Sequence, residues 1–141
     1  MSAATEFAPG LTVQHTTVPQ KLSDYKLIAF DMDSTLITIE CIDEIADATG
    51  KKAEVAAITE ATMRGEITDF KDSLRQRVGK LAGVTEADMA RVLQERLQLS
   101  PGAEKLVAAA QAAGLKVLLV SGGFTYFAEH VRKLLGIDFV R

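Results

Sequence analysis

Residues 27–30, Leu-Ile-Ala-Phe, form a short apolar run that ends directly in two carboxylates, Asp31 and Asp33. An apolar run of this length predicts a strand that is buried on both faces, as in a parallel sheet. The two aspartates then lie at the carboxyl end of the strand, where ligands bind in open α/β sheets. This run therefore indicates an α/β fold and the position of a functional site within it.

The spacing of Asp31 and Asp33 favours a bound cation. Two carboxylates this close resist ionising together unless a positive charge lies between them, and oxygen ligands suit Mg²⁺. The pattern Asp-x-Asp also occurs in loops, where short acids cap helices or close turns. We predict a Mg²⁺ site that serves phosphate chemistry, with a capping role as the alternative.

A second apolar run, residues 115–120, precedes Ser121, Gly122 and Gly123. Its β-branched and aliphatic composition predicts another strand. A hydroxyl beside two residues without side chains allows backbone amides to approach an anion closely. The alternative is an ordinary turn between a strand and a helix.

Together these segments resemble the phosphoserine phosphatases of the haloacid dehalogenase superfamily. The resemblance rests on residues 31–37, on Glu40 with residues 42–46 behind it, and on residues 70–78 and 121–124, which occur in the order typical of that family. It extends from about Lys26 to the end of the sequence. Residues 1–25 carry none of it.

The resemblance implies that O-phospho-L-serine is hydrolysed to L-serine and phosphate, the last step of serine biosynthesis, through an aspartyl-phosphate. Asp31 would be the nucleophile, and Asp33 would protonate the departing seryl oxygen and then activate water. Mg²⁺ would be held by the Asp31 carboxylate and the Asp33 backbone carbonyl. Ser121 and the Gly122 amide would hold the phosphate.

One substrate-binding residue can be reached from periodicity. Phe70, Leu74, Val78 and Leu81 recur at helical spacing and predict an apolar stripe. Arg77 falls within roughly 20° of Phe70 at about 100° per residue, so it lies within that stripe. An arginine there indicates an anionic partner, unless it reaches solvent or pairs with a structural acid.

The resemblance also assigns the substrate-binding side chains. It implies that Arg77 grips the substrate carboxylate, which suits the planar guanidinium fork. It further implies that Phe70 and Met63 close the pocket, and that Glu40 receives the substrate ammonium group.

Composition agrees with the resemblance and adds little to it. The 141 residues are 48% hydrophobic and carry a formal net charge of −3, which predicts a soluble globular chain without a basic surface for nucleic acid. No apolar run is long enough to span a membrane, and no signal-peptide pattern begins the chain. We predict a cytoplasmic protein that binds neither nucleic acid nor membranes.

Three regions are expected along the chain. Residues 1–24 read as an irregular leader, residues 25–40 and 100–141 as part of a Rossmann-like parallel sheet core, and residues 41–99 as an inserted helical cap. Within the cap, Thr85 and Asp88 match a capping box. Ser100 and Pro101 are expected to open a helix, and a last helix is expected from about Thr125 to Leu135.

The end of the sequence leads to a further expectation. Residues 137–141 resemble the start of another strand, and the lysine and the Gly-Asp loop that follow in the family are absent. The core is thus expected to be incomplete at its C-terminus, and the chain alone to be nearly inactive. Two alternatives stay open: a related phosphatase or phosphotransferase for another phosphomonoester, and a non-catalytic domain that binds a phosphorylated ligand.

Overall fold

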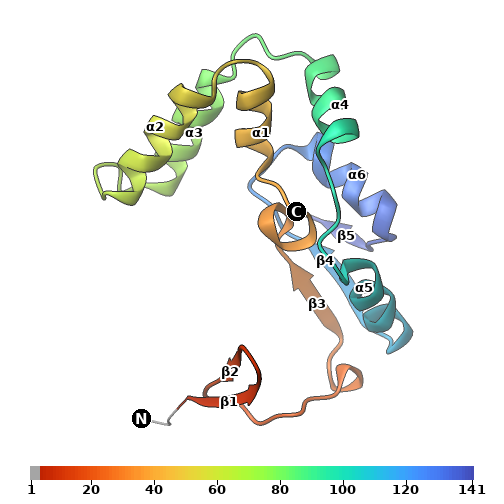
Figure 1. The fold of residues 1–141 in the computed structure, drawn as a ribbon. Coiled ribbons are helices and arrows are strands. Elements are labelled where there is room, and N and C mark those ends of the chain that lie inside the picture. The colour runs from red at the N-terminus through yellow and green to blue at the C-terminus, as the bar shows by residue number, and fades with distance from the viewer. Residues whose placement is uncertain (1–3) are drawn as a thin grey trace.

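A three-stranded parallel sheet organises the molecule. The computed structural model describes residues 4–141, so residues 1–3 of the expected leader lie outside the described part. The strands are β3 (Leu27–Phe30), β4 (Lys116–Leu119) and β5 (Phe139–Val140), in the order β3-β4-β5. Both predicted strands and the strand expected after residue 137 are present, which confirms the α/β fold class (Figure 1).

The register of the sheet places one set of apolar residues on a common face. Ile28 pairs with Val117, and Phe30 pairs with Leu119, which in turn pairs with Val140. Paired residues of parallel strands point to the same side of the sheet. Val117 and Leu119 are fully buried, so this face forms part of the core.

The opposite face of the sheet is exposed, and the prediction that the first strand is buried on both faces is wrong. Leu27 is 50% exposed and Phe139 is 51% exposed. The cause is the handedness of the connections: right-handed crossovers that advance in one direction place their helices on the same side. Helices α5 (Ala103–Ala112) and α6 (Thr125–Leu135) both pack into the core cluster next to Val117 and Leu119.

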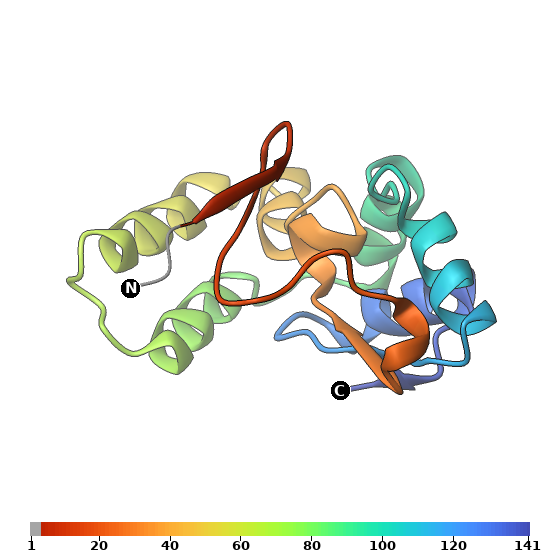
Figure 2. The same ribbon diagram turned by 90° about the horizontal axis from the view of Figure 1, so that it is seen from below.

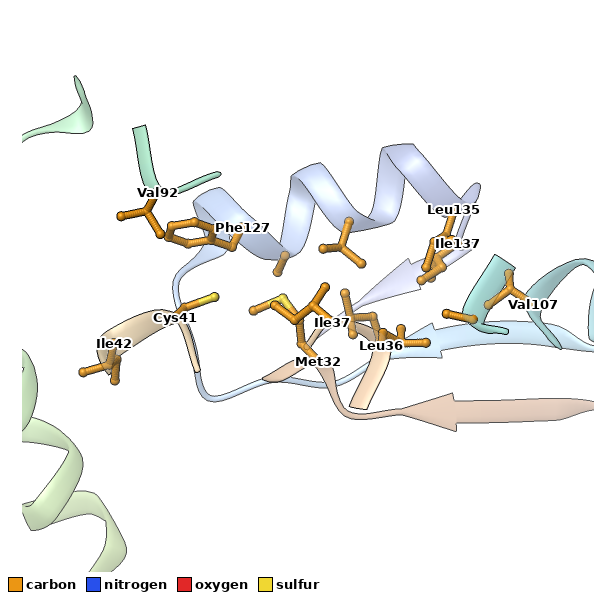
Figure 3. Close-up of a cluster of buried hydrophobic side chains, with 14 of the residues drawn as sticks. Met32, Leu36, Ile37, Cys41, Ile42, Val92, Val107, Phe127, Leu135 and Ile137 are labelled. Atoms are coloured by element: carbon orange, nitrogen blue, oxygen red, sulfur yellow. The ribbon is translucent and has the colours of Figure 1, made fainter. Parts of the chain in front are cut away.

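The turn after β3 fills the centre of this core. Met32, Leu36 and Ile37 are at most 2% exposed and belong to η2 (Met32–Leu36) and its end. Figure 3 shows them between the strands and α6, close to Phe127 and Cys41. The turn that carries Asp31 and Asp33 is therefore anchored by its own apolar side chains.

Four helices occupy residues 41–95. They are α1 (Cys41–Ala48), α2 (Lys52–Met63), α3 (Phe70–Lys80) and α4 (Glu86–Glu95). Helices α2 and α3 form a hairpin that projects from the rest of the molecule (Figure 1). Helices α1 and α4 instead contribute Ile45 and Val92 to the same core cluster as the sheet and α6.

Local sequence signals account for the helix ends. The Thr85 side chain accepts from the Asp88 amide and the Asp88 carboxylate accepts from the Thr85 amide, which confirms the capping box. The last helix runs from Thr125 to Leu135 as predicted. Helix α5 begins at Ala103, after the Ser100–Pro101 pair, because Gly102 takes a left-handed conformation (φ 87°) and sets the helix start.

The segment before the sheet is more regular than expected. Strands β1 (Thr5–Ala8) and β2 (Leu11–Val13) form an antiparallel hairpin that turns at Gly10 (φ 77°). Strands of three or four residues are too short to show a clear alternation in sequence. A 3₁₀ turn, η1 (Leu22–Asp24), follows, and Figures 1 and 2 show the hairpin outside the layer of sheet and helices.

Among residues 4–141, no helix combines the length and apolar character needed to cross a membrane.

Candidate active site

The carboxyl ends of β3 and β4 border a small cleft. The Val120 amide donates to the Phe30 carbonyl oxygen over 2.8 Å, which aligns the two strand ends. The cleft has a volume of about 220 Å³. Its lining comes from the turn after β3, from α1, from α3 and from the loop after β4: Asp31, Asp33, Glu40, Ile42, Asp43, Phe70, Leu74, Arg77, Ser121, Gly122 and Gly123.

Asp31 is exposed and directly follows the carboxyl end of β3. Its Oδ1 atom accepts a hydrogen bond from the Met32 amide over 2.8 Å, so the side chain caps the turn that follows. Met32 is fully buried, so its side chain anchors this turn in the core. The capping role considered as an alternative is therefore present, and it leaves the carboxylate open to the cleft.

Asp33 is held more tightly. Its Oδ2 atom accepts from the backbone amide of Cys41, the first residue of α1, over 3.0 Å. Its Oδ1 atom is buried and has no hydrogen-bond partner among the described residues. Burial raises the pKa of Asp33, and the charges of Glu40 and Asp31 raise it further against the lowering effect of Cys41. A carboxyl with a raised pKa is suited to donate a proton.

The loop after β4 forms a close backbone approach to Asp33. The Gly123 amide donates to Ser121 Oγ over 3.0 Å, which leaves the hydroxyl proton of Ser121 available for a ligand. A Cβ atom on Gly123 would lie 3.1 Å from Ser121 Oγ and 3.3 Å from Met32 Cε. The sequence analysis considered both glycines as part of an anion cradle, but the resemblance assigned a role to Gly122 alone and none to Gly123.

The opposite wall of the cleft comes from α3. Arg77 lies beside Phe70 and Leu74, as the helical spacing indicates. Its Nε atom is buried without a hydrogen-bond partner among the described residues. Phe70 reaches the cleft but is 65% exposed. The wall thus presents an unpaired guanidinium nitrogen next to apolar carbon.

Two further carboxylates lie at the start of α1. Glu40 Oε1 accepts from Ser34 Oγ over 2.6 Å. Asp43 also lines the cleft, and burial and the charge of Glu40 raise its pKa while the charge of Arg77 lowers it. Asp43 was not predicted as a site residue; it is the third residue of α1, and Glu40 is the residue that precedes this helix.

Met63 lies outside the cleft, against the expectation that it closes the pocket. It is 85% exposed and lines a separate hollow between α1 and α2 with Ala46 and Thr59. The preceding residue, Thr62, shares a 2.7 Å hydrogen bond with Ser73 of α3. Since successive helical residues are about 100° apart, this contact directs Met63 away from α3.

The charges of the cleft fit a bound cation. Four carboxylates, those of Asp31, Asp33, Glu40 and Asp43, face a single arginine. Their oxygens are the ligands that Mg²⁺ prefers. Within residues 4–141, no group of three or more histidine, cysteine or acidic side chains has a metal-holding arrangement, and no lysine lines the cleft. The described part therefore offers an incomplete set of ligands.

Comparison with known proteins places these features in a family. The phosphoserine phosphatase of Albidiferax ferrireducens is 68% identical over 137 residues, which are 97% of this chain and 58% of that protein. A solved structure of a substrate-bound phosphoserine phosphatase has a TM-score of 0.74 and 36% identity, covering 82% of this chain and 54% of the other. The chain thus spans little more than half the length of these relatives.

A second solved structure, a phospho-aspartyl intermediate analogue of a phosphoserine phosphatase, has a TM-score of 0.73 and 37% identity over the same share of both chains. Residues 25–140 match the sequence model of the haloacid dehalogenase-like hydrolases. This range includes the turn after β3, the four helices and the loop after β4. With most of its length matched in this way, the chain belongs to the haloacid dehalogenase-like hydrolases.

Proposed function

We propose that this protein is a phosphoserine phosphatase that releases phosphate from O-phospho-L-serine. The observation that carries the proposal is that one cleft has two kinds of binding group: the aspartates and Ser121 lie at the strand ends, and Arg77 Nε, which has no hydrogen-bond partner within residues 4–141, lies on the wall formed by α3. A ligand with a phosphate at one end and a carboxylate at the other would match both. The named relatives support this substrate.

In the proposed reaction, an Asp31 oxygen attacks phosphorus while the bond from phosphorus to the seryl oxygen breaks. Asp33 donates a proton to that oxygen, because a serine alkoxide is a poor leaving group. Water then attacks the aspartyl-phosphate, Asp33 accepts its proton, and phosphate and free Asp31 result. The raised pKa of Asp33 supports its role as the acid.

We propose Mg²⁺ as the cofactor, held by the Asp31 carboxylate and the Asp33 backbone carbonyl. When bound, the cation neutralises phosphoryl oxygens and so allows one anion to approach another. The excess of carboxylates in the cleft supports this assignment. Ser121 and the Gly122 amide would hold the phosphate that Asp31 attacks.

The other end of the ligand would meet α1 and α3. Arg77 would bind the substrate carboxylate through its planar fork, and Glu40 would receive the ammonium group. Phe70 would cover the ligand from the solvent side. Residues 41–99 would then act as a cap over the core formed by residues 25–40 and 100–141. We expect the activity to serve serine biosynthesis in the cytoplasm.

One observation favours a second candidate, a domain that binds a phosphorylated ligand without turnover. In residues 4–141 the cleft lacks a lysine, and its metal ligands are incomplete. Both readings agree on binding through Ser121 and Arg77. They differ in whether Asp31 reacts.

Phosphate release from O-phospho-L-serine with Mg²⁺ separates the two candidates. We would compare this chain, a fusion of it with the part of the Albidiferax relative that the match leaves out, and the fusion with Asp31→Asn. We expect turnover by the fusion, its loss with Asp31→Asn, and a rate for the chain alone at least about tenfold lower. Binding without turnover in the fusion would refute the proposal and favour the second candidate.

Arg77→Ala tests the choice of substrate in the same fusion. We expect it to raise KM for phosphoserine far more than for phenyl phosphate, which has no carboxylate. Equal effects on both substrates would argue for another phosphomonoester.

A further inference from the structure

Ser34 has an unusual backbone conformation beside the cleft. It follows Asp33 directly and has φ 51° and ψ 19°, in the left-handed region. Residues other than glycine, asparagine and aspartate seldom adopt this region, and such strain persists only when the surrounding contacts stabilise it. The contacts of Ser34 therefore indicate what the strained residue does.

Ser34 makes two hydrogen bonds to the segment just before α1. Its backbone amide donates to the Ile39 carbonyl oxygen over 3.1 Å, and its hydroxyl donates to Glu40 Oε1 over 2.6 Å. The neighbouring residue Asp33 accepts from the Cys41 amide. Three such bonds close the loop of residues 33–41 and tie Glu40 to the turn that carries Asp33.

We propose that Ser34 is a positioning residue that holds the Glu40 carboxylate in place to receive the ammonium group of the ligand. This inference rests on the proposed function. Glu40 is exposed, and a free glutamate side chain samples several rotamers, which a ligand would have to restrict on binding. The hydroxyl proton of Ser34 occupies one lone pair of Oε1, so the other oxygen of Glu40 remains available.

The positioning of Glu40 by Ser34 requires the Ser34 hydroxyl and not only its backbone conformation. The variants must therefore separate the effect of the hydroxyl from that of the backbone. Ser34→Gly removes the hydroxyl but tolerates the left-handed conformation. Thr35→Ala is the matched control, because it removes the hydroxyl of the next residue in the same turn. Glu40→Ala removes the partner through which Ser34 would act.

The first measurement is calorimetric binding to the chain with Asp31→Asn, which prevents turnover. The two ligands are O-phospho-L-serine and 3-phosphooxypropionate, which is phosphoserine without its ammonium group. We expect Ser34→Gly to weaken phosphoserine binding about five- to tenfold more than binding of the analogue, as the loss of one charge-assisted hydrogen bond allows. Thr35→Ala should show no such difference, and Ser34→Gly should have no further effect in a Glu40→Ala background.

The outcomes are distinguishable. Equal weakening of both ligands by Ser34→Gly, or an effect that persists without Glu40, would overturn the positioning role. Failure of both ligands to bind would count against the proposed function instead. In that case a double-mutant cycle of Ser34→Gly and Glu40→Ala, measured by urea unfolding, tests whether the two side chains interact. Non-additivity of about threefold or more in the unfolding equilibrium constant would support the Ser34–Glu40 interaction, and additivity would overturn it.

Discussion

The Cys41 backbone amide and the Asp33 carboxylate form a 3.0 Å hydrogen bond that joins the first residue of α1 to the turn after β3. The bond places the Cys41 side chain in the core, where it is fully buried. Figure 3 shows its sulfur pointing between the sheet and α6. Cys41 therefore holds the Asp33 carboxylate with its backbone amide and packs its thiol into the core.

The Cys41 thiol is expected to be unreactive in the folded chain. Burial strongly raises its pKa, and the nearby charge of Asp33 raises it further, so the thiolate that reacts with alkylating agents is scarce. We predict no modification by iodoacetamide at neutral pH, and complete modification in urea. Since the chain has one cysteine, mass spectrometry reports this site alone. Rapid native labelling would show that the thiol is accessible.

Gly123→Ala should disturb the loop that faces Asp33. The added methyl would lie 3.1 Å from Ser121 Oγ and 3.3 Å from Met32 Cε, so these two side chains must give way by a few tenths of an ångström. We expect a loss of about 1–3 kcal/mol in unfolding free energy and weaker phosphate binding. Urea unfolding and calorimetry measure both effects.

Gly79→Ala provides the control for that prediction. Gly79 lies within α3, and a Cβ atom there would meet no heavy atom within 4 Å. It should stabilise the chain by about 0.5–1 kcal/mol because alanine favours a helix. Stabilisation by Gly123→Ala as well would contradict the close approach described for the loop.

Asp138 should stabilise the fold in a pH-dependent manner. Its carboxylate accepts from the Val117 amide and from Lys116 Nζ, each over 2.9 Å, and the first contact lowers its pKa most. A pKa that is lower in the folded state gives stability above the unfolded pKa, and this is lost as the pH falls through the folded value. The urea midpoint of Asp138→Ala should therefore approach that of the unmodified chain as the pH falls through and below the ordinary range of aspartate pKa values.

Asp138→Asn serves as the comparison for Asp138→Ala. The amide oxygen can still accept from Val117, whereas the charge that attracts Lys116 is gone. At neutral pH, the urea midpoint of Asp138→Asn should lie between that of Asp138→Ala and that of the unmodified chain. A gap that stays constant across the whole pH range would rule out ionised Asp138 as the cause.

Thr85→Ala should destabilise α4. The threonine hydroxyl accepts from the Asp88 amide at the helix start, and an alanine would leave that amide without its cap. We expect a loss of about 1 kcal/mol in the free energy of unfolding, measured in urea. Thr85→Ser keeps the hydroxyl and should stay close to the unmodified chain, so equal losses in both variants would exclude capping as the reason.

Local sequence patterns correctly predicted the secondary-structure features that depend on nearby residues. The apolar runs before Asp31 and Ser121 predicted the strands, and the spacing around Arg77 placed it on the face of α3 that meets the cleft. The Thr85–Asp88 pair located the start of α4. In each case, residues nearby in the sequence determine the structure.

Features that depend on distant contacts were missed. The exposure of Leu27 follows from the handedness of two crossovers, which no local pattern encodes. The direction of Met63 depends on the contact between Thr62 and Ser73 in another helix. The strain at Ser34 appears only once the loop closes on Glu40.

Helix α1 packs against α2 and α4 while its first amide holds Asp33. Any displacement of α1 relative to the turn after β3 would change the length of the bond between Cys41 and Asp33. A displaced α1 would therefore misalign the acid. The position of α1 would thus affect both the shape of the cleft and the orientation of Asp33 for proton transfer. Substitutions that loosen α1 would alter both together.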